Sequence, residues 1–500
     1  MTSLVQEVPM GRTPEALVRS PAWQQREALL RRDVTAVELV EAVLREIDRL
    51  NPMVNAVVHL DEATARQQAA QLDTRIARGE DPGPLHGVPI TIKDTLDVTG
   101  LATTAGTSRY AGNVPSQDAP AVARLRGAGA VIVGKTNVPK LAGDYQTYNS
   151  LFGLTRNPWA LDRTCGGSSG GSAVSVACGF GALDVGSDTA GSLSLPAHYC
   201  GVYAHKPTYG RVSTLGHVPP APGSRLERDI TVVGPLARDP RDLAVAFEVL
   251  SGDPLTLQGS PEPRGLRIAA LIDDHHVPLD PDVAHAMHTA VDALRDAGFD
   301  IGERGGPAID IGAVQDVCCE LIAAAASAVM PDDKFDFIDE VASGLSGDDT
   351  SQVALLARGT VMSHRRWLQL QEWVREYQAA WADYFRDVDL VVCPVGPTAA
   401  FPHDVESDRE SRTLSVAGAT SSYFAQLAWP SVVGLAYLPA TTIPAGSTPS
   451  GLPVGLQVVA PFGCDHLALS GANAFDEILG GYRLPPIIEP GGRASTGSLP

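Results

Sequence analysis

The sequence predicts a single large α/β domain, and three observations lead to that prediction. The chain has 500 residues, of which 44% are hydrophobic, so it can bury a sizeable core. Apolar runs rich in β-branched residues alternate with segments of helical periodicity. The sequence has no internal repeat, and no linker in it is long or polar enough to divide residues 1–500 into two domains.

Two helices are expected first. Thr35 and Glu38 form a capping box, and apolar residues then recur at helical spacing until Asn51-Pro52, where we expect the helix to stop. A second helix is expected from Glu62 to Arg78, followed by the turn-rich link DPGPLHG. These two helices begin an N-terminal third in which helix and strand signals alternate.

The following segments alternate strand and helix. The run VPITIKD predicts a short strand with Lys93 near its end. AVARLRGAG then predicts a helix with a glycine stop, and AVIVGKTN predicts a buried strand that ends in polar residues. Ser169 to Cys178 favours a helix packed closely against a sheet, and ALDVGSD predicts a strand that runs into a turn at Ala190-Gly191.

The second half of the chain begins with another strand and helix and then becomes helical. LRIAALID and the segment from Asp282 to Gly298 form this βα unit, and a helical region is expected near 310–430. Within it, aromatic and apolar residues from Trp367 to Trp381 recur every three or four positions, which is typical of a core-facing helix. VDLVVCPV and GLPVGLQVVAP predict two more buried strands, with a charged surface loop at 403–412 between them.

The charge of the chain argues against a polyanionic partner. It carries 58 acidic and 38 basic residues, a net charge of −20, which disfavours nucleic acid or an anionic membrane and favours a small-molecule partner. No signal peptide is visible at the start, and the apolar run LIAAAASAVM is shorter than the roughly 20 residues that a membrane-spanning helix needs. We therefore expect a soluble, cytoplasmic protein.

The seven cysteines show neither metal-ligand nor disulfide-framework spacing, so we expect reduced thiols and no metal site. Cys165 adjoins a glycine-rich stretch and is expected to be a small buried residue.

The glycine- and serine-rich stretch from Gly166 to Ser192 is the main candidate for chemistry. It lacks the Gly-Lys-Ser/Thr ending of a phosphate-binding loop and the G-x-S-x-G pattern of a nucleophile elbow. If one of its serines is a nucleophile, any of the twelve histidines elsewhere could serve as its base. A lysine such as Lys93 is the other candidate, provided that desolvation lowers its pKa by about 2 to 3 units.

Five motifs in this chain resemble those of the amidase signature family. They are GVPITIKD (87–94), GKTN (134–137), RNPWALDRTCGGSSGGS (156–172), GSDTAGSLSLPAHYCG (186–201) and KPTYGRVS (206–213). The resemblance runs from about residue 20 to 250 and resumes at CPVGPTAAFP and GLPVGLQ, whereas about 255–390 shows little of it. It implies a central mixed β-sheet covered by helices on both sides, with the divergent helical region shaping the substrate pocket.

The resemblance also implies a catalytic site. By position, Ser192 corresponds to the family's nucleophile, Ser168 to the bridging serine that follows a cis peptide, and Lys93 to the base. The three residues would relay a proton from Ser192 through Ser168 to Lys93 and return it to the departing amine. The backbone N–H groups of Thr189, Ala190, Gly191 and Ser192 would form the oxyanion hole, worth about 3 kcal/mol per donor in other enzymes.

Several positions depart from the family pattern. Ala190 replaces a usual glycine, so either the turn needs no positive φ there or the oxyanion hole is altered. Ser194 and Leu195 stand where members acting on acidic substrates often have arginine, which favours a neutral amide. Lys140 and His205 also differ from the family pattern, without an assigned meaning.

Four further residues have expected supporting roles. Asp188 is expected to brace the turn before Ser192, and Gly143, Asp144 and Tyr145 are candidates for the acyl pocket, with a purely structural role as the alternative.

The resemblance implies an amidase that hydrolyses a neutral aryl or alkyl amide through an acyl-enzyme on Ser192, without a cofactor. Carbamates or esters could acylate the same serine. One alternative is an acyl-transfer or amide-forming enzyme, or an amidotransferase A-type subunit that works with partner chains. Another is a non-catalytic binding protein that kept the fold. A homodimer is common in the family.

Overall fold

The computed structural model describes residues 13–80, 83–253, 263–272, 277–302, 305–307 and 310–488. The first and last twelve residues of the single domain expected over 1–500 lie outside the described residues.

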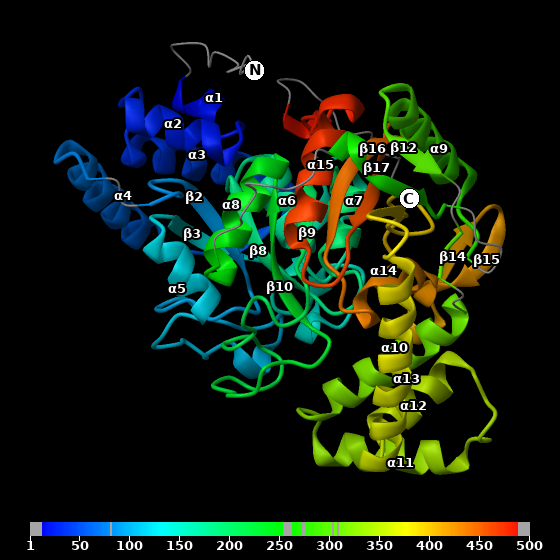
Figure 1. The fold of residues 1–500 in the computed structure, drawn as a ribbon. Coiled ribbons are helices and arrows are strands. Elements are labelled where there is room, and N and C mark those ends of the chain that lie inside the picture. The colour runs from blue at the N-terminus through cyan, green and yellow to red at the C-terminus, as the bar shows by residue number, and fades with distance from the viewer. Residues whose placement is uncertain are drawn as a thin grey trace.

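A mixed sheet of eleven strands forms the centre of the molecule (Figure 1). In spatial order the strands are β1 (Val57–Leu60), β3 (Val131–Thr136), β2 (Pro89–Lys93), β8 (Leu183–Asp188), β10 (Val232–Ala237), β9 (Tyr203–Lys206), β16 (Ala440–Ser447), β17 (Pro453–Val459), β13 (Leu390–Pro394), β11 (Arg267–Ala270) and β12 (Asp300–Gly302). The predicted α/β fold with a mixed sheet is therefore confirmed.

The predicted strands β2, β3, β8, β11, β13 and β17 are present within one to three residues of the expected ends. Sequence analysis missed the five strands β1, β9, β10, β12 and β16. Three of these, β10, β9 and β16, run consecutively through the middle of the sheet and join its two halves by antiparallel pairing.

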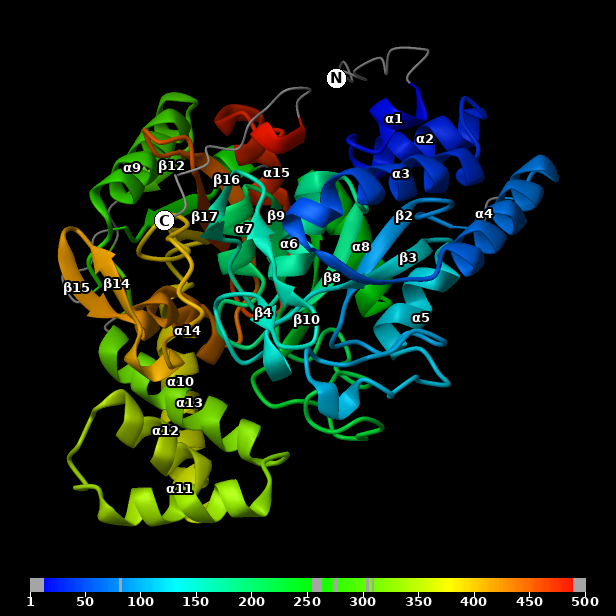
Figure 2. The same ribbon diagram turned by 180° about the vertical axis from the view of Figure 1, so that it is seen from behind.

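Helices cover both faces of the sheet, as Figures 1 and 2 show from opposite sides. One core cluster joins the sheet to α5 (Pro120–Gly127), α8 (Pro240–Ser251), α9 (Pro281–Asp296) and α15 (Asp465–Leu479). A second joins it to α1 (Pro14–Leu17), α2 (Ala22–Arg31), α3 (Ala36–Val54), α4 (Glu62–Ala77), α6 (Gly170–Cys178) and α7 (Ser194–Cys200).

The predicted capping box at the start of α3 is present, with the Thr35 hydroxyl accepting from the Glu38 backbone and the Glu38 carboxylate accepting from Thr35. The predicted stop at Asn51-Pro52 is wrong by about three residues. The helix continues through Pro52 to Val54 and ends at Asn55, which adopts a left-handed conformation (φ 52°). A proline near the last turn costs the helix one hydrogen bond and does not force it to end.

A third core cluster belongs to the helical region that follows β12 (Figure 1). Its helices are α10 (Ile311–Ser327), α11 (Asp332–Gly344), α12 (Gln352–Thr360), α13 (His364–Tyr384) and α14 (Ala428–Leu435). Between α13 and α14 the chain adds β13 to the main sheet and forms the hairpin β14 (Thr413–Val416) and β15 (Ala419–Ser422). The expected helical region at 310–430 is therefore interrupted by strands.

The sheet positions the site because β2 runs parallel to both β3 and β8. The carboxyl ends of parallel strands meet at one edge, which brings Lys93, the last residue of β2, beside the end of β8 at Asp188. The strand period of two gives Thr91 and Lys93 the same face, and Thr91 contacts Ser175 of α6 at 2.8 Å. Lys93 therefore faces the α6 side of the sheet.

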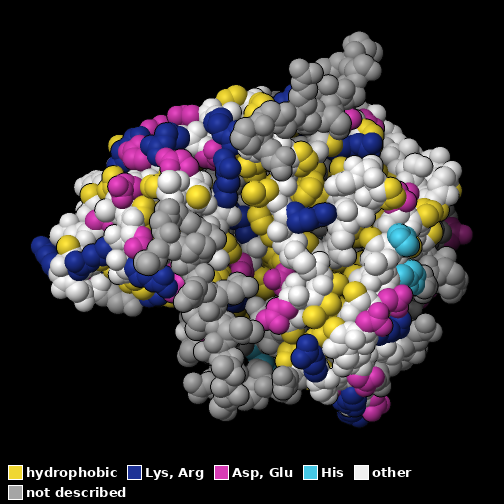
Figure 3. Space-filling view, turned by 90° about the horizontal axis from the view of Figure 1, so that it is seen from above, with side chains coloured by type: hydrophobic (Ala, Val, Ile, Leu, Met, Phe, Trp, Pro, Cys, Tyr) yellow, Lys and Arg dark blue, Asp and Glu magenta, His cyan; other side chains and the backbone are white. Residues whose placement is uncertain are grey.

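The face of the molecule in Figure 3 shows acidic and basic side chains interspersed, without one continuous patch of either sign. Ion pairs such as Arg45–Glu15 (2.7 Å) and Arg66–Glu41 (2.6 Å) join charges on the N-terminal helices.

The N-terminal helices are held to the sheet by Arg238, which is 3% exposed. Its guanidinium donates to the carbonyls of Val176 and Gly181 (2.7 and 2.8 Å) and to those of Val18 and Ser20 (2.9 and 2.8 Å). One side chain thus ties the α1–α2 connection to both ends of the turn after α6.

We predict that Arg238→Met lowers the free energy of unfolding by about 3 kcal/mol, because four buried carbonyls lose a charged donor. Thermal unfolding and limited proteolysis of the N-terminal helices would measure the change. The control is Arg45→Met, which removes an exposed ion pair and should cost less than about 1 kcal/mol. Equal losses in the two variants would contradict the assignment.

Candidate active site

The turn between β8 and α7 holds the predicted nucleophile, Ser192. Ser192 is partly exposed, although Gly191 and Leu193 on either side of it are buried. Gly191 has φ 99°, and a Cβ there would lie 2.9 Å from Leu195 and from Pro430, so only glycine fits. Ala190 has no positive φ. The turn therefore takes its left-handed residue at Gly191, and alanine at 190 leaves the backbone unstrained.

Asp188 braces this turn, as predicted. Its Oδ1 accepts the N–H of Gly191 at 2.7 Å, and its Oδ2 accepts the N–H of Leu193 at 2.7 Å. The expected oxyanion hole needs a correction here, because the Gly191 N–H already points at the carboxylate. The N–H groups of Thr189, Ala190 and Ser192 have no acceptor among the described residues, so three of the four predicted donors remain available.

The serine-rich loop before α6 packs directly against the nucleophile turn. The Gly167–Ser168 peptide is cis, as the resemblance implied, and the Ser169 N–H donates to the carbonyl of Ser192 at 3.1 Å. A Cβ at Gly167 would lie 2.5 Å from the carbonyl oxygen of Asp144. Close backbone contact thus brings Ser168 beside both Ser192 and the predicted pocket segment.

Lys93 is completely buried and lies among serines. Its Nζ is 2.7 Å from Ser168 Oγ, 2.8 Å from Ser169 Oγ and 2.9 Å from Ser187 Oγ, with the Ser187 carbonyl at 3.3 Å. The structure therefore brings together the predicted base and the predicted bridging serine. Ser169 and Ser187 lie inside the quoted motifs, but sequence analysis assigned them no role.

Burial lowers the pKa of Lys93 to about 7, because the charged ammonium loses its water. The carboxylates of Asp188 and Asp184 act in the opposite direction, and the nearby Arg228 guanidinium lowers the pKa further. The lowered pKa agrees with the expectation that desolvation lets this lysine lose its proton near pH 7. A neutral amine with a lone pair can accept a proton from Ser168.

The histidine alternative receives no support from the geometry. Among the described residues, no histidine is hydrogen bonded to Ser168 or Ser192. His217 alone reaches the network, with Nε2 2.9 Å from Ser187 Oγ. Sequence analysis missed His217 and Arg228 because both lie in the irregular segment between β9 and β10, where no periodicity or motif marks them.

Of the three predicted pocket residues, one is exposed to solvent and a second has its carboxylate bonded to other side chains. Gly143 is exposed, and the Asp144 carboxylate is 2.7 Å from Arg412 Nη1 and 2.6 Å from the Tyr423 hydroxyl. Arg412 is 3% exposed, so the surface loop expected at 403–412 is wrong at its last residue. The charged loop looked exposed in sequence because Asp144, the ion-pair partner of Arg412, is 268 residues away.

Tyr145 is the predicted pocket residue that keeps a free polar atom. Its ring packs against Tyr423, with the centroids 5.9 Å apart, and its hydroxyl has no hydrogen bond among the described residues. The backbone of Asp144 and Tyr145 adjoins Gly167, the residue before Ser168.

The positions that depart from the family pattern have structural explanations in two cases. Leu195 is fully buried in a cluster with Tyr199, Val395 and Ala400. His205 is buried on β9 and contacts Thr441 at 2.9 Å and Asp465 at 3.2 Å. Lys140 is exposed, and nothing in the structure explains it.

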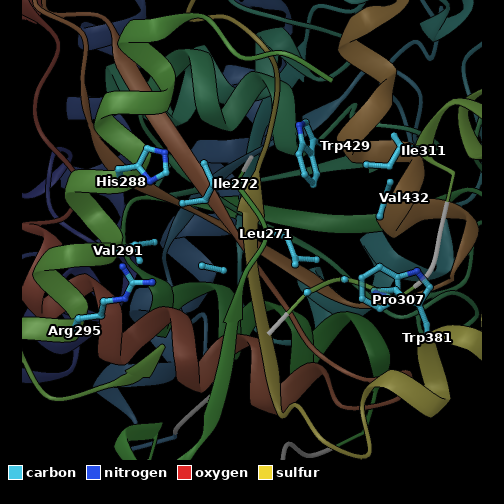
Figure 4. A pocket seen from close by; sticks show the side chains of 13 residues that line it. Leu271, Ile272, His288, Val291, Arg295, Pro307, Ile311, Trp381, Trp429 and Val432 are labelled. Carbon is cyan, nitrogen blue, oxygen red and sulfur yellow. The ribbon is translucent and has the colours of Figure 1, made fainter. Parts of the chain in front are cut away.

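A cavity of about 370 Å³ lies between α9 and the helices α13 and α14. In Figure 4, His288 and Arg295 of α9 lie across it from Trp381 and Trp429. Lys93, Ser168 and Ser192 are not among its lining residues. Helix α14 separates it from the nucleophile turn, since Pro430 contacts the Gly191 position while Trp429 lines the cavity.

In the described part of the chain, no group of three or more His, Cys, Asp or Glu side chains could hold a metal ion. No helix among the described residues is long and apolar enough to cross a membrane.

Comparison with known proteins gives consistent matches along the chain. The Amidase family model matches residues 38–469. The A-type subunit of glutamyl-tRNA(Gln) amidotransferase from Roseiflexus sp. (strain RS-1) is 35% identical over 486 residues, which cover 91% of this chain and 95% of that protein. Indoleacetamide hydrolase of Bradyrhizobium diazoefficiens is 32% identical over 482 residues, covering 92% of this chain and 88% of that one.

A solved structure agrees with these matches. The crystal structure of an amidase superposes with a TM-score of 0.78 at 30% identity and covers 92% of this chain and 100% of its own. The chain therefore belongs to the amidase signature family, whose enzymes act on amide C–N bonds.

Proposed function

We propose that this protein hydrolyses a carboxylic amide through an acyl-enzyme on Ser192. The observation that carries the proposal is the contact between the buried Lys93 amine and Ser168, at 2.7 Å, with the pKa of Lys93 lowered to about 7. Ser192 Oγ forms a bond to the carbonyl carbon, and its proton passes to Ser168 while the Ser168 proton passes to Lys93. As the substrate's C–N bond breaks, the proton returns from Lys93 through Ser168 to the leaving amine. Water then hydrolyses the ester.

The negative charge that forms on the carbonyl oxygen would be held by the backbone N–H groups of Thr189, Ala190 and Ser192. These donors are fixed by the turn that Asp188 braces, so they need no reorganisation during the reaction. Gly191 adopts the positive φ that the turn needs, whereas its N–H is already bonded to Asp188.

A neutral aryl or alkyl amide is the proposed substrate class. If Asp144 lines the acyl pocket as predicted, it offers the substrate no unpaired charge, because its carboxylate is paired with Arg412 at 2.7 Å. Tyr145 adds an aromatic ring and one hydroxyl. The relative named indoleacetamide hydrolase is consistent with an aromatic amide. Carbamates and esters could acylate the same serine.

An amidotransferase A-type subunit is the second candidate, together with other acyl-transfer or amide-forming activities. The 35% identity to the A-type subunit of an amidotransferase over most of both chains favours it. In that case the chain would act with partner proteins, and the ammonia it releases would be consumed elsewhere.

We predict that Ser192→Ala lowers hydrolysis of a model aryl amide by about 1,000-fold or more, because no covalent intermediate can form. Intact-protein mass spectrometry during turnover should show an acyl adduct in the wild type, mapping to Ser192. Ser194→Ala, two residues later and 4% exposed, is the control and should retain the adduct. An adduct that persists in Ser192→Ala would refute the assignment.

The pH profile of kcat/KM should rise tenfold per pH unit below about 7, the pKa of Lys93, and level off above it. Below that pH the amine carries a proton and has no lone pair for Ser168. Lys93→Met should remove the activity at every pH. Lys206→Met is a matched control, since Lys206 is also buried but donates to the Leu438 carbonyl at 2.6 Å. Its profile should keep the same midpoint. A midpoint that shifts in Lys206→Met, or activity that survives in Lys93→Met, would contradict the assignment.

A substrate panel separates the two candidate functions. The purified chain should hydrolyse indole-3-acetamide and a neutral anilide more efficiently than L-glutamine or a dicarboxylate half-amide, without ATP or another protein. The readout is kcat/KM for each amide. Activity confined to glutamine, or dependent on an added partner, would favour the amidotransferase alternative, and preference for the half-amide would overturn the neutral substrate class.

A further inference from the structure

His217 lies on the segment between β9 and β10 and is 4% exposed. Backbone hydrogen bonds join this segment to residues 95–97, which follow Lys93 in the sequence. The Val218 N–H donates to the Thr95 carbonyl at 2.7 Å, and the Asp97 N–H donates to the Gly216 carbonyl at 2.9 Å. The imidazole is thus held in a fixed position relative to the end of β2.

The contacts of the ring determine which nitrogen carries the proton. His217 Nδ1 is 2.9 Å from the Pro219 carbonyl oxygen, which can only accept, so Nδ1 carries the hydrogen. Burial, the Arg228 guanidinium and the Lys93 amine hold the pKa of His217 well below its usual value, so the ring is neutral. Nε2 therefore has a lone pair, and the Ser187 hydroxyl at 2.9 Å donates to it.

The available donors and acceptors also fix the direction of the other hydrogen bonds around Lys93. The Ser187 proton is committed to His217, so Ser187 Oγ accepts from Lys93 Nζ at 2.9 Å. The Ser169 hydroxyl donates to the Ser187 carbonyl at 3.2 Å, so Ser169 Oγ also accepts from Nζ, at 2.8 Å. A neutral amine has two N–H bonds and one lone pair. Of the two remaining neighbours, the Ser187 carbonyl at 3.3 Å can only accept, so the lone pair faces the Ser168 hydroxyl at 2.7 Å.

We propose that His217 is a positioning residue that acts through Ser187 to aim the lone pair of Lys93 at Ser168. The inference rests on the proposed function, in which Lys93 is the base. Without an acceptor at His217 Nε2, the Ser187 hydroxyl can rotate and donate to Lys93, and it then competes with Ser168 for the lone pair. His217 therefore touches no substrate, yet it determines how often the base is correctly oriented.

A double-mutant cycle with a serine-reactive fluorophosphonate tests this directly, because the rate of labelling at Ser192 reports nucleophile activation without a known substrate. His217→Leu leaves the Ser187 hydroxyl free to compete for the lone pair, and Ser187→Ala removes the acceptor that holds one N–H of Lys93. Each should slow labelling by about tenfold, the scale of one lost hydrogen bond. The double variant should be no slower than Ser187→Ala alone, since both changes break one chain of contacts.

His217→Gln is the rescue variant, because its amide offers both an acceptor for Ser187 and a donor for Pro219. Its labelling rate should return to within about threefold of the wild type. His205→Leu is the matched control, since His205 is equally buried but contacts Thr441 and Asp465. It should label at the wild-type rate in its folded fraction, judged by near-ultraviolet circular dichroism.

Three results would overturn the proposal. They are a Ser187→Ala variant that labels at the wild-type rate, losses that multiply in the double variant, and a His217→Gln variant as slow as His217→Leu. Ser187→Ala and His217→Gln decide the matter even if His217→Leu does not fold. If the wild type is not labelled at Ser192 at all, the proposed function fails and this inference fails with it. If Ser192 is labelled at the same rate in the wild type and in the His217 variants, only this inference fails.

Discussion

The burial of one amine, that of Lys93, is the constraint on which the site depends. Lowering its pKa from 10.5 to about 7 corresponds to about 5 kcal/mol of stabilisation of the neutral form relative to the charged one. The unfolded chain binds the extra proton between these two pKa values. The contribution of Lys93 therefore makes stability rise with pH across that range, and the fold carries the full cost of the charged form below about pH 7. Proteins retain such a residue where a reaction needs it.

The polar atoms around Lys93 make that burial tolerable. Three serine hydroxyls and one carbonyl surround its Nζ, and the carboxylates of Asp188 and Asp184 act from the adjacent strand. Asp184 is itself fully buried, and burial raises its pKa to about 6. It accepts from Thr91 at 2.6 Å and Thr136 at 3.1 Å, so β2, β3 and β8 are joined by side chains as well as by their ladders. The same groups that tune the base hold the sheet edge together.

The helical region packs directly against the nucleophile turn. Helix α14 contacts the nucleophile turn through Pro430, and α10 and α13 share a core cluster with α14, Ala190 and Tyr145. The nucleophile turn therefore lies between two parts of the fold, the sheet that holds Lys93 and Ser187 and the helical region that covers Ala190 and Gly191.

The sequence by itself determined the α/β class, most buried strands, the capping box of α3 and the three candidate catalytic positions, because these depend on local periodicity and on contiguous motifs. Only the tertiary structure decided which polar groups face one another. It paired Asp144 with Arg412, turned the Gly191 N–H toward Asp188 and brought His217 to Ser187. Such contacts join residues that are far apart in the chain or lie in irregular segments. No local pattern encodes them, since burial and hydrogen-bond direction arise only when the strands and loops are assembled.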